Sequence, residues 1–147
     1  MSDGLSKRRL KLWIRLLGVT RAAEAELRDF LRKGHGTTLP RFDVMAALHR
    51  RSEPVTMGEL SRYLLVSNGN ATAVVDRLEA EGLVARLPDP ADRRTVRVAL
   101  TEAGRAAFER LAADHEAAVD RLFARLDEAG IEAMTAQLKR LRGGARA

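Results

Sequence analysis

The 147-residue sequence has no cysteine and no apolar run long enough to cross a bilayer. Without thiols the protein can form no disulfide bridge and no thiolate zinc site, and it cannot sense redox state by thiol oxidation. Met1 to Gly4 lead directly into a charged segment with no signal-peptide pattern, so we expect a cytoplasmic protein. The length corresponds to one compact domain or two very small ones.

Residue patterns typical of enzymes are missing as well. The three histidines, His35, His49 and His115, are not spaced as metal ligands, and no H-E-x-x-H pair or phosphate-binding glycine loop occurs. The carboxylates Glu79 and Glu81 fall at a predicted helix end, where they favour solubility rather than catalysis. We therefore expect no enzyme activity, no metal site and no cofactor.

Positive charge is in excess and unevenly distributed. The formal net charge is +6, and residues 1–50 account for it with 11 basic and 5 acidic side chains, whereas residues 51–100 hold 7 of each. The run from Lys7 to Arg15 supplies much of the surplus. Such charge favours a nucleic acid or another anion as partner, although an arginine-rich helix can also serve solubility alone.

The two ends of the chain have the apolar spacing of long helices. Apolar residues three and four apart predict a helix over residues 6–33 that ends at Gly34-His35-Gly36. At 1.5 Å per residue this helix would reach about 40 Å, more than a compact core of this size needs. The same spacing returns between Thr101 and Leu126 and again after Gly130. We expect residues 1–37 and 102–147 to interlock in a homodimer; an intrachain bundle is the alternative.

Residues 38–101 are predicted to form three short helices and a β-hairpin. Thr38 is the expected N-cap of the first helix, and Thr56 with Glu59 forms an S/T-x-x-E capping box for the next. The third helix starts near Ser67 and ends at Gly82. Apolar residues then alternate over 83–87 and 95–100, on either side of the turn-forming stretch 88–94, which is typical of a two-stranded hairpin.

Residues 56–82 have the spacing of a helix-turn-helix, whose second helix enters the major groove of DNA and reads bases with its first residues. Asparagine amides can pair with adenine, and hydroxyls at a helix start can hold phosphate. Arg77 follows on the same face. The candidate contacts at the helix start are Ser67, Asn68, Gly69, Asn70 and Thr72. Helix capping alone is the alternative for these polar residues.

The hairpin loop would make this unit a winged helix. Arg93 and Arg94 lie at the far end of the loop, where an arginine would meet the negative potential of a narrow minor groove. Asp92 is expected to hold one of their guanidinium groups by a bidentate pair. A solvated turn with an ordinary surface ion pair is the alternative.

Two stretches resemble the MarR family of transcriptional regulators. Residues 59–70, which end in LLVSNGN, and residues 75–84, VDRLEAEGLV, are similar to the family's recognition region. The wing resembles the family's D-x-R motif, with Asp92 and Arg94 followed by alternating apolar residues up to Leu100-Thr101. The flanking helices have matching order and length, so the resemblance spans nearly the whole chain.

The resemblance implies a mainly α fold with a small β-hairpin wing, in which a winged helix-turn-helix (38–101) lies between long N- and C-terminal dimerisation helices. It also implies a homodimer that binds a pseudo-palindromic operator, usually as a repressor released by a small ligand. On this pattern Asn68, Asn70 and Thr72 lie in the major groove, Arg94 enters the minor groove and Asp92 braces the wing. A winged helix that acts only as an architectural or protein-interaction module is the alternative.

The resemblance further implies an effector site between the dimerisation helices and the winged domain. An anionic effector, either a small aromatic acid or an acyl-coenzyme A thioester, needs a cation, which favours Arg15 and His35. Core or dimer packing is the alternative for the apolar candidates, and His49, like His115, falls on an apolar face. The candidates are Trp13, Arg15, His35, Phe42, Met45, His49 and Arg62.

Overall fold

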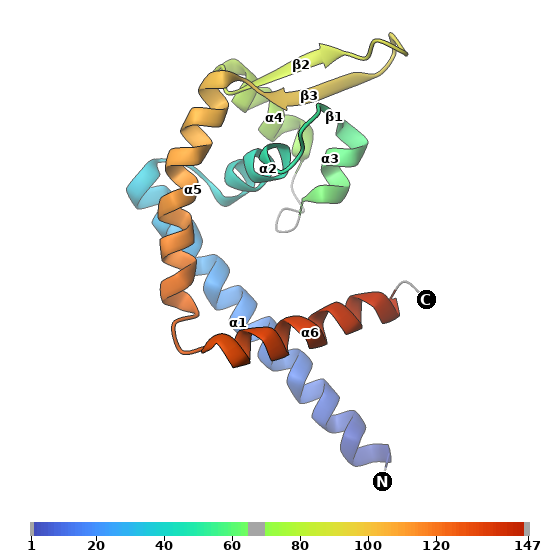
Figure 1. Cartoon of the computed structure of the whole chain (residues 1–147), viewed down its shortest axis with the longest axis vertical. Helices are drawn as coiled ribbons and strands as arrows, with labels where there is room; N and C mark the ends of the chain where they lie inside the picture. Colours follow the sequence, from blue (N-terminus) through green and yellow to red (C-terminus); the bar gives the residue numbers. More distant parts are fainter. Residues whose placement is uncertain (1, 65–69, 146–147) are drawn as a thin grey trace.

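The computed structural model describes residues 2–64 and 70–145. Over these residues the chain is mainly helical, with a small antiparallel sheet near its middle (Figure 1). The elements are α1 (Ser2–His35), α2 (Leu39–His49), β1 (Val55–Thr56), α3 (Met57–Tyr63), α4 (Ala71–Ala80), β2 (Val84–Pro88), β3 (Val96–Leu100), α5 (Glu102–Leu122) and α6 (Glu128–Ala145).

Local signals set the ends of the first two helices. Gly36 adopts a φ of 60°, a left-handed conformation that suits glycine, and its N–H bonds back to the Arg32 carbonyl at the end of α1. Thr38 then caps α2, since its side chain accepts a hydrogen bond from the Arg41 N–H at 3.3 Å. The predicted stop at residues 34–36 and the predicted cap at Thr38 are both confirmed.

Helix α2 forms the centre of the core. Residues 42–48 are all buried, so this helix is covered on every side rather than along one stripe. Helices α3, α4 and α5 and strand β3 pack around it, and the core continues into them. Fully buried side chains from these surroundings include Leu60, Leu78 and Val98. Each such side chain contributes about 1.5–3 kcal/mol of hydrophobic stabilisation, which fixes the short helices and the sheet relative to one another.

The sheet contains one strand more than the sequence predicts. Strands β2 and β3 form the expected hairpin, with a register that runs from Val84 opposite Leu100 to Pro88 opposite Val96. Strand β1 adds two residues to the outer side of β3, in the order β1-β3-β2. The predicted hairpin is confirmed, whereas β1 was not predicted, because a two-residue strand is too short to show an alternating pattern.

Four helix boundaries differ from the prediction, the first being the start of α1 at Ser2 rather than at residue 6. The helix expected to start near Ser67 begins at Ala71 as α4, with Asn70 as its N-cap. Helix α5 ends at Leu122 rather than Leu126. Helix α6 starts at Glu128, before Gly130, because the Asp127 carboxylate accepts the Gly130 N–H at 2.8 Å and so caps the first turn.

Two segments extend away from the part of the chain that contains the sheet (Figure 1). The second half of α1 packs against α5, but its first half projects outward. Helix α6 has no extended packing against another helix or strand of the described chain, and most of its described residues are exposed. A closed intrachain bundle is therefore not formed. None of the helices within 2–64 and 70–145 has the length and apolar character needed to span a membrane.

Candidate nucleic-acid interface

Helix α4 presents a polar face to solvent and an apolar face to the core. Val75 and Leu78 are buried, whereas Thr72 and Arg77 are exposed. The Asn70 side-chain oxygen accepts the Ala73 N–H at 3.3 Å, so this asparagine is an N-cap. The cap uses one of the two lone pairs of this oxygen and leaves both amide N–H groups available, so a bidentate pair with adenine would have to share the capping oxygen. The other candidates at this helix start, Ser67, Asn68 and Gly69, lie outside the described residues.

Arg86 joins α4 to the base of the wing. From strand β2 it contacts Asp76 at 2.6 Å and Glu79 at 2.8 Å, both on α4. Its backbone N–H also donates to Glu79 at 3.3 Å. The hydrogen bond to Asp76, supported by Glu79, raises the pKa of Arg86. Because both carboxylates lie on one helix, this single guanidinium links α4 to the base of the hairpin at two points.

Asp92 closes the tip of the wing through the backbone. Its carboxylate accepts the Arg94 N–H at 3.0 Å and the Thr95 hydroxyl at 3.0 Å. The expected pair with the guanidinium of Arg93 or Arg94 was therefore wrong within the described structure. A short carboxylate reaches the N–H two residues ahead more readily than the end of a long neighbouring side chain. Both wing-tip guanidinium groups are consequently exposed, and no partner for them occurs in the described residues.

Arg97 holds the base of the wing, and the sequence reading did not identify it. Its Nε donates to Asp89 at 3.1 Å, and its Nη1 donates to the Pro54 carbonyl at 3.2 Å. The same nitrogen lies 3.8 Å from the Glu59 carboxylate on α3. The Ala91 N–H and the Arg97 guanidinium both favour the charged carboxylate and hold the pKa of Asp89 below its ordinary value.

The carboxylates of the winged region thus pair with only some of its arginines, and other arginines are left without an acidic partner. Arg41, Arg86 and Arg97 are engaged by acidic partners, which are Glu59, Asp76, Glu79, Glu81 and Asp89. By contrast, six exposed arginines of this region have no acidic partner among the described residues: Arg50, Arg51, Arg62, Arg77, Arg93 and Arg94. A segment with a net charge near zero therefore still exposes guanidinium groups, among them those on α3, α4 and the wing, and groups of this kind can bind phosphate.

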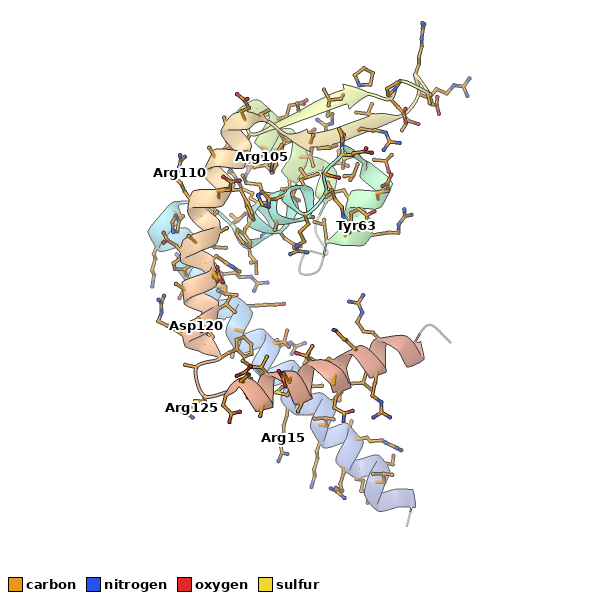
Figure 2. All side chains as sticks on the ribbon, in the orientation of Figure 1. Arg15, Tyr63, Arg105, Arg110, Asp120 and Arg125 are labelled. Carbon is orange, nitrogen blue, oxygen red and sulfur yellow. The ribbon has the colours of Figure 1, made fainter. Side chains whose placement is uncertain are left out.

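The effector candidates lie in different parts of the structure. Trp13 and Arg15 are exposed on the outer half of α1, and Figure 2 shows Arg15 far from the sheet. Arg15 and His35, the favoured pair, are separated by about 30 Å of helix in one chain. Arg62 is exposed on α3. One chain therefore does not bring these candidates together.

The remaining candidates line the junction between α2 and α5. Phe42 stacks on His115 with ring centroids 4.1 Å apart, and burial lowers the pKa of His115. His49 contacts Glu109 at 3.4 Å and the Phe108 ring at 4.7 Å. His35, at the end of α1, contacts Asp114 of α5 at 3.2 Å. These contacts pack the winged part of the chain against α5.

A cavity of about 260 Å³ lies at this junction. His35 and Met45 line it together with two arginines that the sequence reading missed, Arg41 and Arg110. The Nη2 atom of Arg41 pairs with Glu81, but its Nε is buried and has no hydrogen-bond partner among the residues that the structure describes. No local sequence signal identifies these arginines, because the walls come from α1, α2 and α5. Within the described residues, no group of three or more potential metal ligands occurs.

Comparisons with known proteins identify a family. The sequence model of the MarR family matches residues 35–95. The HTH-type transcriptional regulator MhqR of Bacillus subtilis is 30% identical over 138 residues, which cover 93% of this chain and 93% of MhqR. The transcriptional activatory protein BadR of Rhodopseudomonas palustris is 40% identical over 95 residues, which cover 63% of this chain but only 49% of BadR.

Solved structures agree with this assignment. Sco3205, a MarR family regulator from Streptomyces coelicolor solved in complex with DNA, has a TM-score of 0.81 at 23% identity, over 95% of this chain and 88% of that chain. BpsR of Bordetella bronchiseptica, whose DNA binding is regulated by 6-hydroxynicotinic acid, has a TM-score of 0.75 at 26% identity, over 86% of this chain and 89% of that chain. The chain belongs to the MarR family of winged helix-turn-helix, DNA-binding transcriptional regulators and is not an enzyme.

Proposed function

We propose that this regulator binds a pseudo-palindromic operator as a homodimer and acts as a repressor that a small anionic aromatic acid releases. The DNA-binding part of the proposal rests on one observation: the carboxylates of the winged region pair with only some of its arginines. Arg93 and Arg94 at the wing tip and Arg77 on α4 are exposed without acidic partners in the described residues. The neighbouring carboxylates are held by other arginines.

In this proposal Asn70 and Thr72 at the start of α4 read the major groove. Ser67, Asn68 and Gly69, which precede them in the sequence, are proposed to contribute to the same contact. Arg77 binds phosphate, and the wing places Arg93 and Arg94 in the adjacent minor groove, where narrow A·T-rich segments attract arginine. Asn70 contributes an amide N–H donor, since its oxygen caps the helix. Asp92 shapes the tip rather than contacting DNA.

Selection from a randomised duplex library tests sequence-specific binding. We expect the purified chain to enrich one inverted-repeat sequence, with half-site centres about 10–10.5 bp apart. It should bind that duplex about 4 kcal/mol or more tightly than a scrambled one at fixed salt. Arg94→Ala should weaken binding several-fold or more. Arg105→Ala, on the exposed surface of α5, removes the same charge and should bind as the wild type (Figure 2).

Equal, weak binding to the enriched and scrambled duplexes would contradict this proposal. It would favour the alternative of an architectural or protein-interaction module, for which the wing-tip arginines have no evident use. A footprint that covers only one half-site would contradict the homodimer.

The homodimer is supported by apolar side chains that one chain leaves uncovered. They gather on α1 and α6 and include Trp13, Ile14, Ile131, Leu138 and Leu141, each 44–59% exposed. A groove of about 700 Å³ between α5 and α6 and a further one between α1 and α6 are lined mainly by such residues. In proteins most helical stability comes from packing of an apolar face, so α6 requires a cover, and a second copy with the same uncovered helices provides it.

Sedimentation velocity tests the dimer. The wild type should sediment as a dimer at micromolar concentration, and Leu138→Glu should shift it towards the monomer by placing a charge in the apolar surface. Leu87→Glu is the matched control, because Leu87 is similarly exposed at 40% but lies on the wing. A monomeric wild type, or an equal effect of both substitutions, would contradict the proposed interface.

The effector is proposed to bind the cavity at the α2–α5 junction. The buried, unpartnered Nε of Arg41 and the nearby Arg110 supply cations for a carboxylate, and Met45 supplies an apolar wall. A volume of about 260 Å³ favours a small aromatic acid over a complete acyl-coenzyme A thioester. The regulation of BpsR by 6-hydroxynicotinic acid supports this ligand class.

Isothermal titration calorimetry with 6-hydroxynicotinic acid and with benzoate tests the cavity. Arg110→Gln should weaken binding about tenfold, whereas Arg105→Gln, on the same helix but outside the cavity, should leave it unchanged. The bound acid should also release the enriched duplex. Binding that is insensitive to Arg110→Gln would place the effector elsewhere.

A further inference from the structure

Arg97 connects the wing to the stretch of sequence around Pro54, 43 positions away. From the second position of strand β3 it bonds Asp89 in the wing loop and the carbonyl of Pro54 before β1, and it faces Glu59 on α3. About a third of its side chain is exposed, and only 11% of Asp89 is. Arg97 therefore joins the loop that carries the wing tip to the first helix of the helix-turn-helix.

Apart from core packing between α3 and β3, which includes Leu60 and Val98, few contacts join the wing to α3 in the described residues. The backbone connection is the β1–β3 ladder, which contains only two residue pairs, Val55 with Val98 and Thr56 with Arg97. The hairpin ladder ends where Pro88 faces Val96, and the loop beyond this pair projects away from the helices (Figure 1). The direction of that loop is therefore sensitive to contacts at its base, of which the Arg97–Asp89 pair is one.

The contacts continue from this base to the tip. Asp89 also accepts the Ala91 N–H at 2.9 Å, and its own N–H donates to the Thr95 carbonyl at 3.1 Å. Asp92 then bonds the Arg94 N–H and the Thr95 hydroxyl. A series of polar contacts thus runs from α3 through Arg97 and Asp89 to the backbone that carries the wing-tip arginines.

We propose that Arg97 is a positioning residue that sets the direction of the wing relative to the helix-turn-helix, so that the wing tip and α4 can engage adjacent grooves of one duplex. This inference rests on the proposed DNA-binding function. Arg97 acts through Arg93 and Arg94 and contacts no base itself. A guanidinium suits this role because its planar fork donates in two directions at once, to the carboxylate and to the carbonyl.

A double-mutant cycle on the enriched duplex tests the proposal. Arg97→Gln should weaken binding about tenfold in the wild-type background. It should weaken binding less than twofold in the Arg94→Ala background, since a residue that acts through the wing tip has little to position once the tip has lost its arginine. Arg97→Lys, which keeps the charge and the pairing with Asp89 but loses the fork, should restore part of the affinity. Arg105→Gln is the control for loss of one charge.

Footprinting gives a readout that general destabilisation does not produce. With Arg97→Gln, hydroxyl-radical protection should be lost at the minor-groove positions of the wing, while methylation protection at major-groove guanines should remain at saturating protein. Thermal unfolding followed by circular dichroism should show that the variant is folded at the assay temperature. Asp89→Asn should reproduce the same pattern from the other side of the pair.

The outcomes distinguish this inference from the proposed function. If the wild type enriches a duplex and Arg94→Ala weakens binding, but Arg97→Gln binds as the wild type or is additive with Arg94→Ala, the positioning role is overturned and the proposed function stands. Loss of protection in both grooves together would also overturn the positioning role. If the wild type enriches no sequence, the proposed function fails and the role of Arg97 fails with it.

Discussion

Replacement of Gly104 by alanine should destabilise the fold more than a change of one methyl group normally does. Gly104 lies in the first turn of α5 and is buried. A Cβ atom placed on it would stand 1.9 Å from the carbonyl oxygen of Leu83 and 2.8 Å from the carbonyl carbon. These are backbone atoms, so no side chain can rotate to make room. The N-terminus of α5 must move away from the start of β2.

The structure sets the size of this effect. The Leu83 carbonyl accepts the Thr101 N–H at 3.1 Å, and the Thr101 hydroxyl donates to the Gly82 carbonyl at 2.6 Å. Overpacking costs about 1–3 kcal/mol, and each hydrogen bond lengthened or lost by the shift adds about 0.5–1.5 kcal/mol. We expect Gly104→Ala to lower the free energy of unfolding by about 2–5 kcal/mol.

Urea unfolding followed by circular dichroism at 222 nm, at fixed protein concentration, measures this change. Gly58→Ala is the matched control, because a Cβ there meets only the Thr56 hydroxyl at 3.9 Å and the residue lies in the helix α3. It should leave stability unchanged or raise it by up to about 1 kcal/mol. If Gly104→Ala unfolds within 0.5 kcal/mol of the wild type, on the order of measurement error, the argument from backbone contact is refuted.

Other consequences of the structure are open to direct measurement. Thr56→Ala removes the cap that accepts the Glu59 N–H and should cost about 1 kcal/mol in the same urea assay; an unchanged midpoint would show that the cap is dispensable. Burial against Phe42 lowers the pKa of His115, so as the pH falls below about 6.5 the unfolded chain takes up the proton first and stability should fall. His115→Gln should make the free energy of unfolding depend less on pH between pH 7.5 and 5.5. An unaltered slope would show that other titrating groups cause the pH dependence. If Arg77 binds phosphate in both subunits of a dimer, Arg77→Gln should weaken binding to enriched and scrambled duplexes alike and reduce the slope of log affinity against log salt by about 2; a selective loss would instead indicate base contact.

Features with a local cause could be predicted from the sequence. The caps at Thr38 and Thr56 depend on residues three positions away, and the long helices depend on spacing that repeats over many turns. The hairpin depends on alternation and on turn-forming residues between the strands. Each of these signals lies within one continuous stretch of sequence, so it can be recognised without knowing which distant residues pack together.

Features that depend on distant residues could not be predicted in this way. Arg97 bonds a carbonyl 43 positions away, and Arg41 pairs with a carboxylate 40 positions away. Many arginines in this sequence have acidic neighbours, and only the packing of α2 and the sheet decides which pairs form. The partner of Asp92 was misjudged for a related reason, because backbone N–H groups compete with side chains for a short carboxylate.

The sparse packing of α6 against the rest of the described chain also affects how operator occupancy depends on the concentration of the regulator. On the proposed dimer, the apolar residues of α6 are covered only after two chains meet, so completing the helix and assembling the binding unit are the same event. A freshly synthesised chain then lacks a finished C-terminal helix until it finds a second copy. Two concentration-dependent steps, pairing and DNA binding, act in series, so operator occupancy should rise more steeply with protein level than a single binding step allows. We therefore expect low operator occupancy below a threshold concentration of the protein and a sharp rise in occupancy above it.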